Sequence, residues 1–470
     1  MATLAVAVSG PTVPEPDVVL RGHANDVQAV CFHPNEKVLY TGDVRGELRA
    51  WDLVTYRPVS VVLAEEHRES GVLSMHAWAE KECLDGAVEK HYRLLSQARG
   101  GVHCVWNLGV DGSLPGCATL CISTLAYAFC RSAVLSRASA ADLATLIVAP
   151  DGSGTDGIVV SAASGSRLAT LSAAAEGCSE AQAKPHGMLM SLDAKWLPAD
   201  GTPTIASMDL ARKALVAGGF EDGSLVLWVL DAAALGCGGG DAAKARGAEQ
   251  PAAGPLAPSA SLPPATSSRG TNPTLRPVAS RRLFKESAMA VQLDALLRGG
   301  VVGGPKRSLV RFALRSEEQS RREDCSALGS VQLDDEGESR RPLLSTPEVE
   351  KSLVGPPARG EEEASCARAP SSPIIRVSAA TKLPYPGVNA VAIRSDARVA
   401  AVASWQGAVR LFAYPSLDPR GALLLHRGQA SSVVFGPLTG RIATAGGEQG
   451  SVGLWSTHAA SFKRTDAAEC

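Results

Sequence analysis

Several features that mark other protein classes are missing from this 470-residue sequence. No apolar run approaches the roughly 18 residues that a membrane-spanning helix needs. No positively charged start precedes the apolar residues at the N-terminus, as a secretory signal would require. The net charge is only −2, which gives no general attraction for nucleic acid or an anionic membrane. We therefore expect a soluble chain that binds neither membrane nor nucleic acid directly.

The cysteines also lack the spacing of a metal site. The 11 cysteines are scattered and none forms a Cys-x-x-Cys pair. Cys117 and Cys121 have no histidine or cysteine pair placed to complete a zinc site. Cys31 and Cys104 stand within strand-like apolar runs, as small buried residues do. This usage predicts no metal and a reducing compartment, so we expect a cytoplasmic and nuclear protein.

Long helical periodicity is absent, and short strand-like segments bounded by Gly, Asp, Pro and Ser take its place. One unit recurs near both ends: a histidine, an apolar strand, a glycine-rich turn and a strand ending in tryptophan. His23 and Trp51 are 28 residues apart, and His426 and Trp455 are 29 apart. Weaker copies end at Trp106, Trp228, Phe312 and Phe412, and one copy from about Leu120 to Leu171 has Val160 in place of the aromatic residue. Seven such units predict an all-β, seven-bladed WD40 β-propeller.

Two segments do not fit the repeat. Residues 232–276 contain no Val, Ile, Phe, Tyr, Trp or Met, and residues 316–370 carry 13 acidic against 7 basic residues. We predict disordered insertions that flank blade five. The predicted division is a disordered lead at 1–15, blades one to four at 16–231, blade five at 277–315, blades six and seven at 371–460, and a tail at 461–470. Residues 16–20 are expected to close the ring as the outer strand of the last blade.

In the best-formed WD repeats, a histidine, a Ser or Thr, a turn Asp and the strand-ending Trp form a buried hydrogen-bonded chain. The structural residues predicted for these repeats are His23, Trp51, Asp52, Trp106, Asp222, Trp228, His426 and Trp455. The turn Asp usually lies six residues before the aromatic residue. Only Asp222 fits, and Arg45 occupies that position in the first repeat. The sequence thus predicts an incomplete chain in most blades.

The same turns are expected to form a partner-facing rim, because propeller loops commonly carry binding residues. The candidate rim residues are Arg45, Arg99, Glu221, Trp405, Gln406 and Gln449. A large aromatic residue such as Trp405 is a plausible interface anchor. Packing of Trp405 against the neighbouring blade is an equally good interpretation from sequence alone.

Motifs for catalysis are lacking. There is no nucleophile elbow, paired-carboxylate motif or phosphate loop. The stretch "GSGTDG" at Gly152–Gly157 is followed by a strand-like run, so it predicts a hairpin turn rather than a dinucleotide site. We predict no catalytic or cofactor-binding residue and a non-enzymatic protein. The enzymatic alternative predicts polar groups with shifted pKa values at the central channel.

The segments "RLLSQARGGVHCVWNL", "AYAFCRSAVLS" and "VNAVAIRSDARVAAVASWQGAVRLF" resemble the family of guanine nucleotide-binding protein beta-subunit-like protein 1 and the fungal ASTRA-associated protein 1. This resemblance implies a WD-repeat scaffold that acts with the TTT co-chaperone complex in the maturation and stability of phosphatidylinositol 3-kinase-related kinases. It also implies a monomer within a larger, chromatin-linked assembly.

Two alternatives remain within the binding class. One is a substrate receptor of a cullin–RING ubiquitin ligase. The other is a heterotrimeric G-protein beta-like signalling scaffold. The second is disfavoured, because a G-protein β subunit needs an N-terminal coiled-coil helix for its γ partner and residues 1–15 include several prolines.

Overall fold

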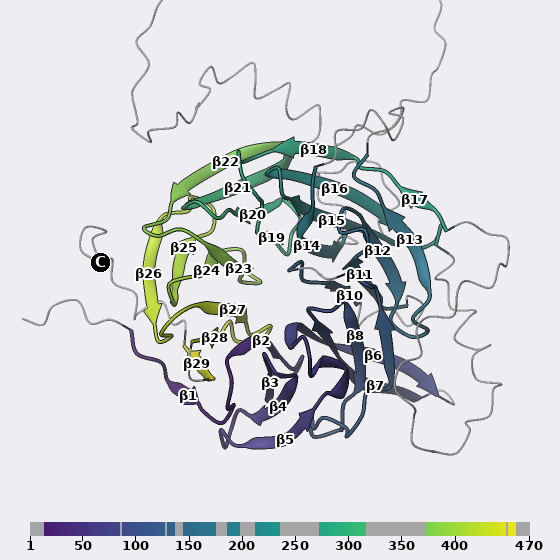
Figure 1. The fold of residues 1–470 in the computed structure, drawn as a ribbon, viewed down its shortest axis with the longest axis vertical. Coiled ribbons are helices and arrows are strands. Elements are labelled where there is room, and N and C mark those ends of the chain that lie inside the picture. Colours follow the sequence, from purple (N-terminus) through teal and green to yellow (C-terminus); the bar gives the residue numbers. More distant parts are fainter. Residues whose placement is uncertain are drawn as a thin grey trace, which may run out of the picture.

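The computed structural model describes residues 14–84, 87–126, 129–136, 144–174, 186–197, 212–235, 272–315, 373–447 and 450–456. Their strands form seven sheets arranged as blades around a centre, and all pairings are antiparallel except one at the edge of the third blade (Figure 1). The predicted all-β, seven-bladed propeller is confirmed. The part of the chain that the structure describes holds one short 3-10 helix, η1 (Glu65–His67), and no α-helix. No described helix has the length and hydropathy to cross a membrane.

The first three blades follow the chain in order. Blade 1 consists of β2 (Val27–Phe32), β3 (Val38–Asp43), β4 (Glu47–Asp52) and β5 (Pro58–Leu63). Blade 2 consists of β6 (Val72–Leu84), β7 (Ala87–Ala98), β8 (Val102–Asn107) and β9 (Leu120–Ser123). Blade 3 consists of β10 (Ala133–Leu135), β11 (Leu146–Pro150), β12 (Gly157–Ser161) and β13 (Arg167–Leu171), with β17 (Thr274–Leu275) added at its edge.

The remaining blades repeat this plan. Blade 4 consists of β14 (Leu189–Trp196), β15 (Lys213–Phe220), β16 (Ser224–Asp231) and β18 (Ala279–Arg282). Blade 5 consists of β19 (Ala290–Leu293), β20 (Gly299–Gly303), β21 (Ser308–Arg315) and β22 (Ile374–Lys382). Blade 6 consists of β23 (Val388–Ile393), β24 (Val399–Ser404), β25 (Ala408–Ala413) and β26 (Pro419–Leu424). Blade 7 consists of β27 (Ala430–Phe435), β28 (Ile442–Gly446), β29 (Ser451–Trp455) and β1 (Val18–Leu20).

The core lies between neighbouring blades rather than inside any one sheet. Every residue of β2 and β3 is buried, whereas the outer strand β5 has no buried residue. One apolar cluster joins Ala29 and Tyr40 of blade 1 to Met75 and Trp106 of blade 2. Inner strands are covered on both faces, so they consist of nearly continuous apolar runs rather than an alternation.

The first strand of the chain closes the ring. Strand β1 pairs antiparallel with β29, and Val18 lies opposite Leu454. The expectation that residues 16–20 supply the outer strand of the last blade is therefore confirmed. This pairing covers an edge of β29 that would otherwise be open.

The positions of the two insertions differ from the prediction. The first begins between β16 and β18 within blade 4, and the second lies between β21 and β22 within blade 5. Residues 274–275, which were assigned to the first insertion, form β17 and pair in parallel with β13. The boundaries failed because β18 has no buried residue and β22 has only one, so neither has the continuous apolar run of an inner strand. Residues 236–271 of the first insertion, the whole of the second insertion at 316–370, residues 1–13 and the tail at 461–470 lie outside the described residues.

The antiparallel order of the strands divides the connections between two faces. Turns between second and third strands lie at the same end of a blade as the connections from one blade to the next. We call this end the rim face. Turns between first and second strands, and connections from third to outer strands, lie on the opposite face. Both insertions therefore start from the opposite face.

Candidate interaction surface

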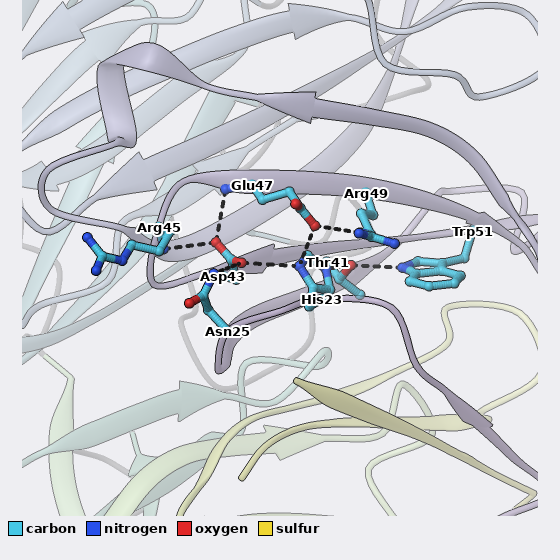
Figure 2. Close-up of polar contacts among 8 residues, drawn as sticks. All are labelled: His23, Asn25, Thr41, Asp43, Arg45, Glu47, Arg49 and Trp51. Atoms are coloured by element: carbon cyan, nitrogen blue, oxygen red, sulfur yellow. Dashed lines mark hydrogen bonds and ion pairs between the residues drawn. The ribbon is translucent and has the colours of Figure 1, made fainter. Parts of the chain in front are cut away.

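Blade 1 holds a hydrogen-bonded chain that reaches from its entry loop to the end of its third strand (Figure 2). His23 precedes the blade, Thr41 lies on β3 and Trp51 lies on β4. The indole N–H of Trp51 donates to Thr41 Oγ1 at 2.8 Å, and His23 Nε2 is 2.7 Å from the same oxygen. All three side chains are buried, so the shared hydroxyl satisfies two groups that water does not reach.

Asp43 completes this chain at the other ring nitrogen. Its Oδ2 lies 3.5 Å from His23 Nδ1, and its Oδ1 accepts the backbone N–H groups of Arg45 at 2.8 Å and Glu47 at 2.9 Å. The side chain of Glu47 also faces this nitrogen, with Oε1 3.2 Å from His23 Nδ1. Burial alone raises the pKa of Asp43, but the hydrogen bonds from His23, Arg45 and Glu47 outweigh it and hold the pKa below its usual value. Because the carboxylate faces Nδ1, we place the ring proton there and let Thr41 donate to Nε2.

The prediction that Arg45 deprives blade 1 of its carboxylate is therefore wrong. The acid is supplied two residues earlier, by Asp43, and the turn brings it to the histidine. The side chain of Arg45 points away from the chain and is exposed (Figure 2). Asp52 does not join the chain either, because its carboxylate accepts the backbone N–H groups of Val54 and Thr55 in the next turn.

Blade 2 repeats the chain without an acid. His67 Nε2 lies 2.7 Å from Ser96 Oγ, and Trp106 Nε1 donates to the same oxygen at 2.8 Å. No hydrogen-bond partner for His67 Nδ1 lies in the described part of the chain. Burial lowers the pKa of His67 to about 4, so the ring is neutral at neutral pH.

Blade 7 resembles blade 2 in this respect. His426 Nε2 lies 2.9 Å from Thr444 Oγ1, to which Trp455 Nε1 donates at 3.1 Å. His426 Nδ1 has no hydrogen-bond partner among the described residues, and burial lowers the pKa of His426 to about 4. Incomplete chains do occur, as the sequence predicted, although not in the first blade.

Blade 4 has the acid and the histidine but lacks the hydroxyl. Asp222 lies at the predicted turn position, 2.9 Å from His186 Nδ1. The hydroxyl is missing, because Gly218 faces the ring of Trp228 on the next strand. The indole N–H of Trp228 donates instead to the carbonyl of Ser172, in the segment after blade 3, at 2.8 Å. The indole thus links two blades.

Trp405 lies on the rim face, in the turn between β24 and β25. Its side chain is 44% exposed. The inner edge of the indole packs on Gly387, just before the first strand of the same blade, and a side chain at Gly387 would clash with it. Trp405 therefore does not extend freely into solvent, because its ring rests on its own blade. It presents one aromatic face to solvent, beside the exposed Gln406.

The other predicted rim residues are spread over the same face. Arg99 Nη2 donates to Gln28 Oε1 at 3.3 Å, and its guanidinium lies 5.8 Å from the ring centre of Phe129. Glu221 accepts the backbone N–H of Met188 at 3.1 Å. Gln449 lies outside the described residues.

Phe129 is a rim residue that the sequence analysis did not single out. It lies in the connection from blade 2 to blade 3 and is 63% exposed. Tyr385, before blade 6, is 41% exposed, and the Arg410 guanidinium stacks over its ring. In the sequence, only one weak signal marks Phe129 and Tyr385 as rim residues: each is an aromatic residue in a connection between blades. With Trp405, these residues give the rim face three exposed aromatic side chains.

The central channel contains a cavity of about 140 Å³ lined by the first strands of the blades. Burial raises the pKa of Asp193, lowers that of Arg131 to about 10 and lowers that of His76 to about 4. These are shifts of the kind that the enzymatic alternative predicts. Each group nevertheless has a structural partner: Asp193 accepts the Leu293 backbone N–H, Arg131 donates to the Ser431 carbonyl, and His76 contacts the Ser132 carbonyl. These contacts bind blades to one another.

Comparison with known proteins identifies the repeat and its relatives. Residues 14–52 match the family described as WD domain, G-beta repeat. ASTRA-associated protein 1 of Penicillium rubens is 34% identical over 108 residues, which are 23% of this chain and 22% of that protein. ASTRA-associated protein 1 of Verticillium alfalfae is 29% identical over 101 residues, 22% of each chain. These matches show a WD repeat at residues 14–52 and a partial similarity to the ASTRA-associated proteins. The match spans about a fifth of the length of these relatives.

Solved structures support the fold alone. The Cps50 (Swd1) β-propeller domain of Myceliophteria thermophila aligns over 95% of this chain and 100% of its own, with a TM-score of 0.54 and 13% identity. Chaetomium thermophilum Raptor aligns over 96% of this chain and 29% of its own, with a TM-score of 0.54 and 10% identity. The WD repeat and the partial similarity to the ASTRA-associated proteins are consistent with a protein-interaction scaffold.

Proposed function

We propose that this scaffold binds the TTT co-chaperone complex through its rim face and acts in the maturation and stability of phosphatidylinositol 3-kinase-related kinases. We further propose that it does so in the cytoplasm and the nucleus. The support is the partial similarity to the ASTRA-associated proteins and the resemblance drawn from the sequence. One structural observation carries the choice of face: Phe129, Tyr385 and Trp405 are exposed there.

These three aromatic residues suit a protein partner for a physical reason. Each presents a large apolar surface while its base is already fixed by packing or by a stacked guanidinium. Little conformational freedom is then lost on binding, and anchors of this type commonly dominate interface energies. The rim face also offers both charge signs, from Arg99 and Glu221.

The test is affinity purification of the full chain from cells, followed by mass spectrometry. TTT subunits and the related kinases should be recovered with the wild-type chain. A Trp405→Ala, Arg99→Glu double variant should lose most of them. Leu438→Ala is the matched control, because Leu438 is 70% exposed in a turn on the opposite face. Recovery of a cullin adaptor without TTT subunits would contradict the proposal and favour the ligase-receptor alternative.

A further inference from the structure

Two cysteines face each other across strands β8 and β9 of blade 2. Cys104 and Cys121 are direct cross-strand partners, and their Sγ atoms are 2.9 Å apart. Both are free thiols. They are 17 residues apart in sequence, with the connection between the strands separating them.

The position of this pair in the ladder favours close approach. The backbone N–H of Thr124 donates to the Gly101 carbonyl at 2.9 Å, which marks Val102 and Ser123 as a pair without mutual hydrogen bonds. Two residues further along, Cys104 and Cys121 occupy the same kind of position. Opposed Cα atoms in such pairs are about 4.5 Å apart, within the roughly 4.4–6.8 Å range of disulfides.

The two thiols differ in access. Cys121 is exposed on the outer strand of the blade, whereas Cys104 is fully buried in the apolar cluster shared by blades 1 and 2. The contact with Cys121 and burial both raise the pKa of Cys104, which keeps it a neutral thiol. A small reagent in solution therefore reaches Cys121 first, and Cys104 is then the nearest thiol to it.

We propose that Cys104 and Cys121 form a reversible cross-strand disulfide, with a low-molecular-weight disulfide as the oxidant. The Cys121 thiolate attacks one sulfur of the small disulfide, forms a mixed disulfide and releases one small thiolate. Cys104 then gives up its proton, and its sulfur attacks the Cys121 sulfur and displaces the second small thiol. In total, two cysteine thiols are oxidised and one small disulfide is reduced to two thiols.

A metal site is the competing explanation for this cluster. A carboxylate oxygen of Glu66 and the two sulfurs all lie within 4.8 Å of one another. Sulfurs bound to one zinc ion at about 2.3 Å in a tetrahedron would stand well over 3 Å apart. The 2.9 Å separation and the direct cross-strand register favour a bond between the sulfurs instead.

The test uses the full chain treated with oxidised glutathione, quenched with acid, alkylated under denaturing conditions and mapped by peptide mass spectrometry. A peptide pair joined through Cys104 and Cys121 should appear, about 2 Da lighter than the two reduced peptides together. Dithiothreitol should abolish it. Cys121→Ser should remove the link without disturbing the core, because the Cys121 side chain is exposed. Cys117→Ser, another exposed cysteine four positions away, should leave the link intact.

Three outcomes would overturn the proposal. The first is a stable glutathione adduct on Cys121 with Cys104 still free. The second is a Cys117–Cys121 link in place of the predicted one. The third is stoichiometric zinc in the protein as purified, lost in both Cys121→Ser and Glu66→Gln, since Glu66 has no role in disulfide formation.

Discussion

Blades 1 and 7 are neighbours that share a histidine, a threonine and a tryptophan, yet among the described residues of the two only blade 1 adds an acid. The histidine–threonine distance is 2.7 Å in blade 1 and 2.9 Å in blade 7, so the shared part is nearly the same. Neither His23 Nδ1 nor His426 Nδ1 has a hydrogen bond among the described residues, but His23 Nδ1 lies 3.5 Å from Asp43 Oδ2 and 3.2 Å from Glu47 Oε1. The threonine hydroxyl is thus enough to hold the histidine and the tryptophan in place in both blades. The acid of blade 1 adds an electrostatic contact to an arrangement that also forms without it.

The largest effect is expected from removing the hydroxyl in either blade. Thr41→Val and Thr444→Val each leave an imidazole nitrogen and an indole N–H buried without a partner, at a cost of about 4 kcal/mol in unfolding free energy. Chemical denaturation should show similar losses for both variants. A loss confined to blade 1 would break the comparison, because it would mean that the acid is essential to the chain.

Acid pH should destabilise blade 7, where His426 Nδ1 has no hydrogen-bond partner among the described residues. The pKa of His426 is about 4 when folded and about 6.5 when unfolded, so the unfolded chain binds more protons between these values. Stability should therefore fall as pH drops from 6.5 towards 4, with His426 contributing on the order of 3 kcal/mol. Denaturation across this range should show a shallower pH dependence for His426→Gln than for wild type. His91→Gln, at an exposed position, is the control, and equal slopes in both variants would contradict the prediction.

A smaller loss is expected from neutralising the acid of blade 1. Asp43→Asn keeps the shape and an acceptor for the Arg45 and Glu47 amides but removes the buried one of the two carboxylate charges that face His23. The expected cost is about 2 kcal/mol in unfolding free energy, measured at pH 7. Asp52→Asn, which also caps a turn but at the surface, should cost clearly less. An Asp43→Asn protein as stable as wild type would show that the charge adds nothing.

The smallest effect is expected from Arg45, which occupies the usual position of the turn Asp in the first repeat. Arg45→Ala should change stability by no more than about 0.5 kcal/mol, because only its backbone N–H takes part in the turn. Denaturant titration of Arg45→Ala beside Asp43→Asn would sharpen the comparison. A larger loss for Arg45→Ala would require a contact for its guanidinium that the structure does not show.

The fold was predictable because its signals are local. The structure contains the features that these signals predicted. They are the blades marked by the spacing from histidine to tryptophan, the apolar inner strands, and the closing strand predicted at residues 16–20. Asp43 was missed because counting back from Trp51 assumes that the acid lies within the turn, whereas here it is the last residue of β3, two positions earlier. The outer strands β18 and β22 have at most one buried residue each and lack the continuous apolar run of an inner strand, so the insertions were placed beside blade 5 rather than within blades 4 and 5.

The candidate site was predictable only in part. Turn residues such as Trp405 follow from the repeat, but the orientation of its ring depends on Gly387, a contact outside the repeat. The Cys104–Cys121 pair depends on cross-strand register, which the length of the intervening connection does not reveal.

The pairing of β1 with β29 has a consequence for synthesis on the ribosome. Val18–Leu20 leaves the exit tunnel early, but its partner is made only when Ser451–Trp455 appears. At about 5–20 residues per second, that delay is on the order of half a minute to a minute and a half. The earlier blades have their local partners at hand during this time, whereas the final contact spans nearly the whole chain and carries the highest loop-closure cost. The strand that is made first is therefore paired last.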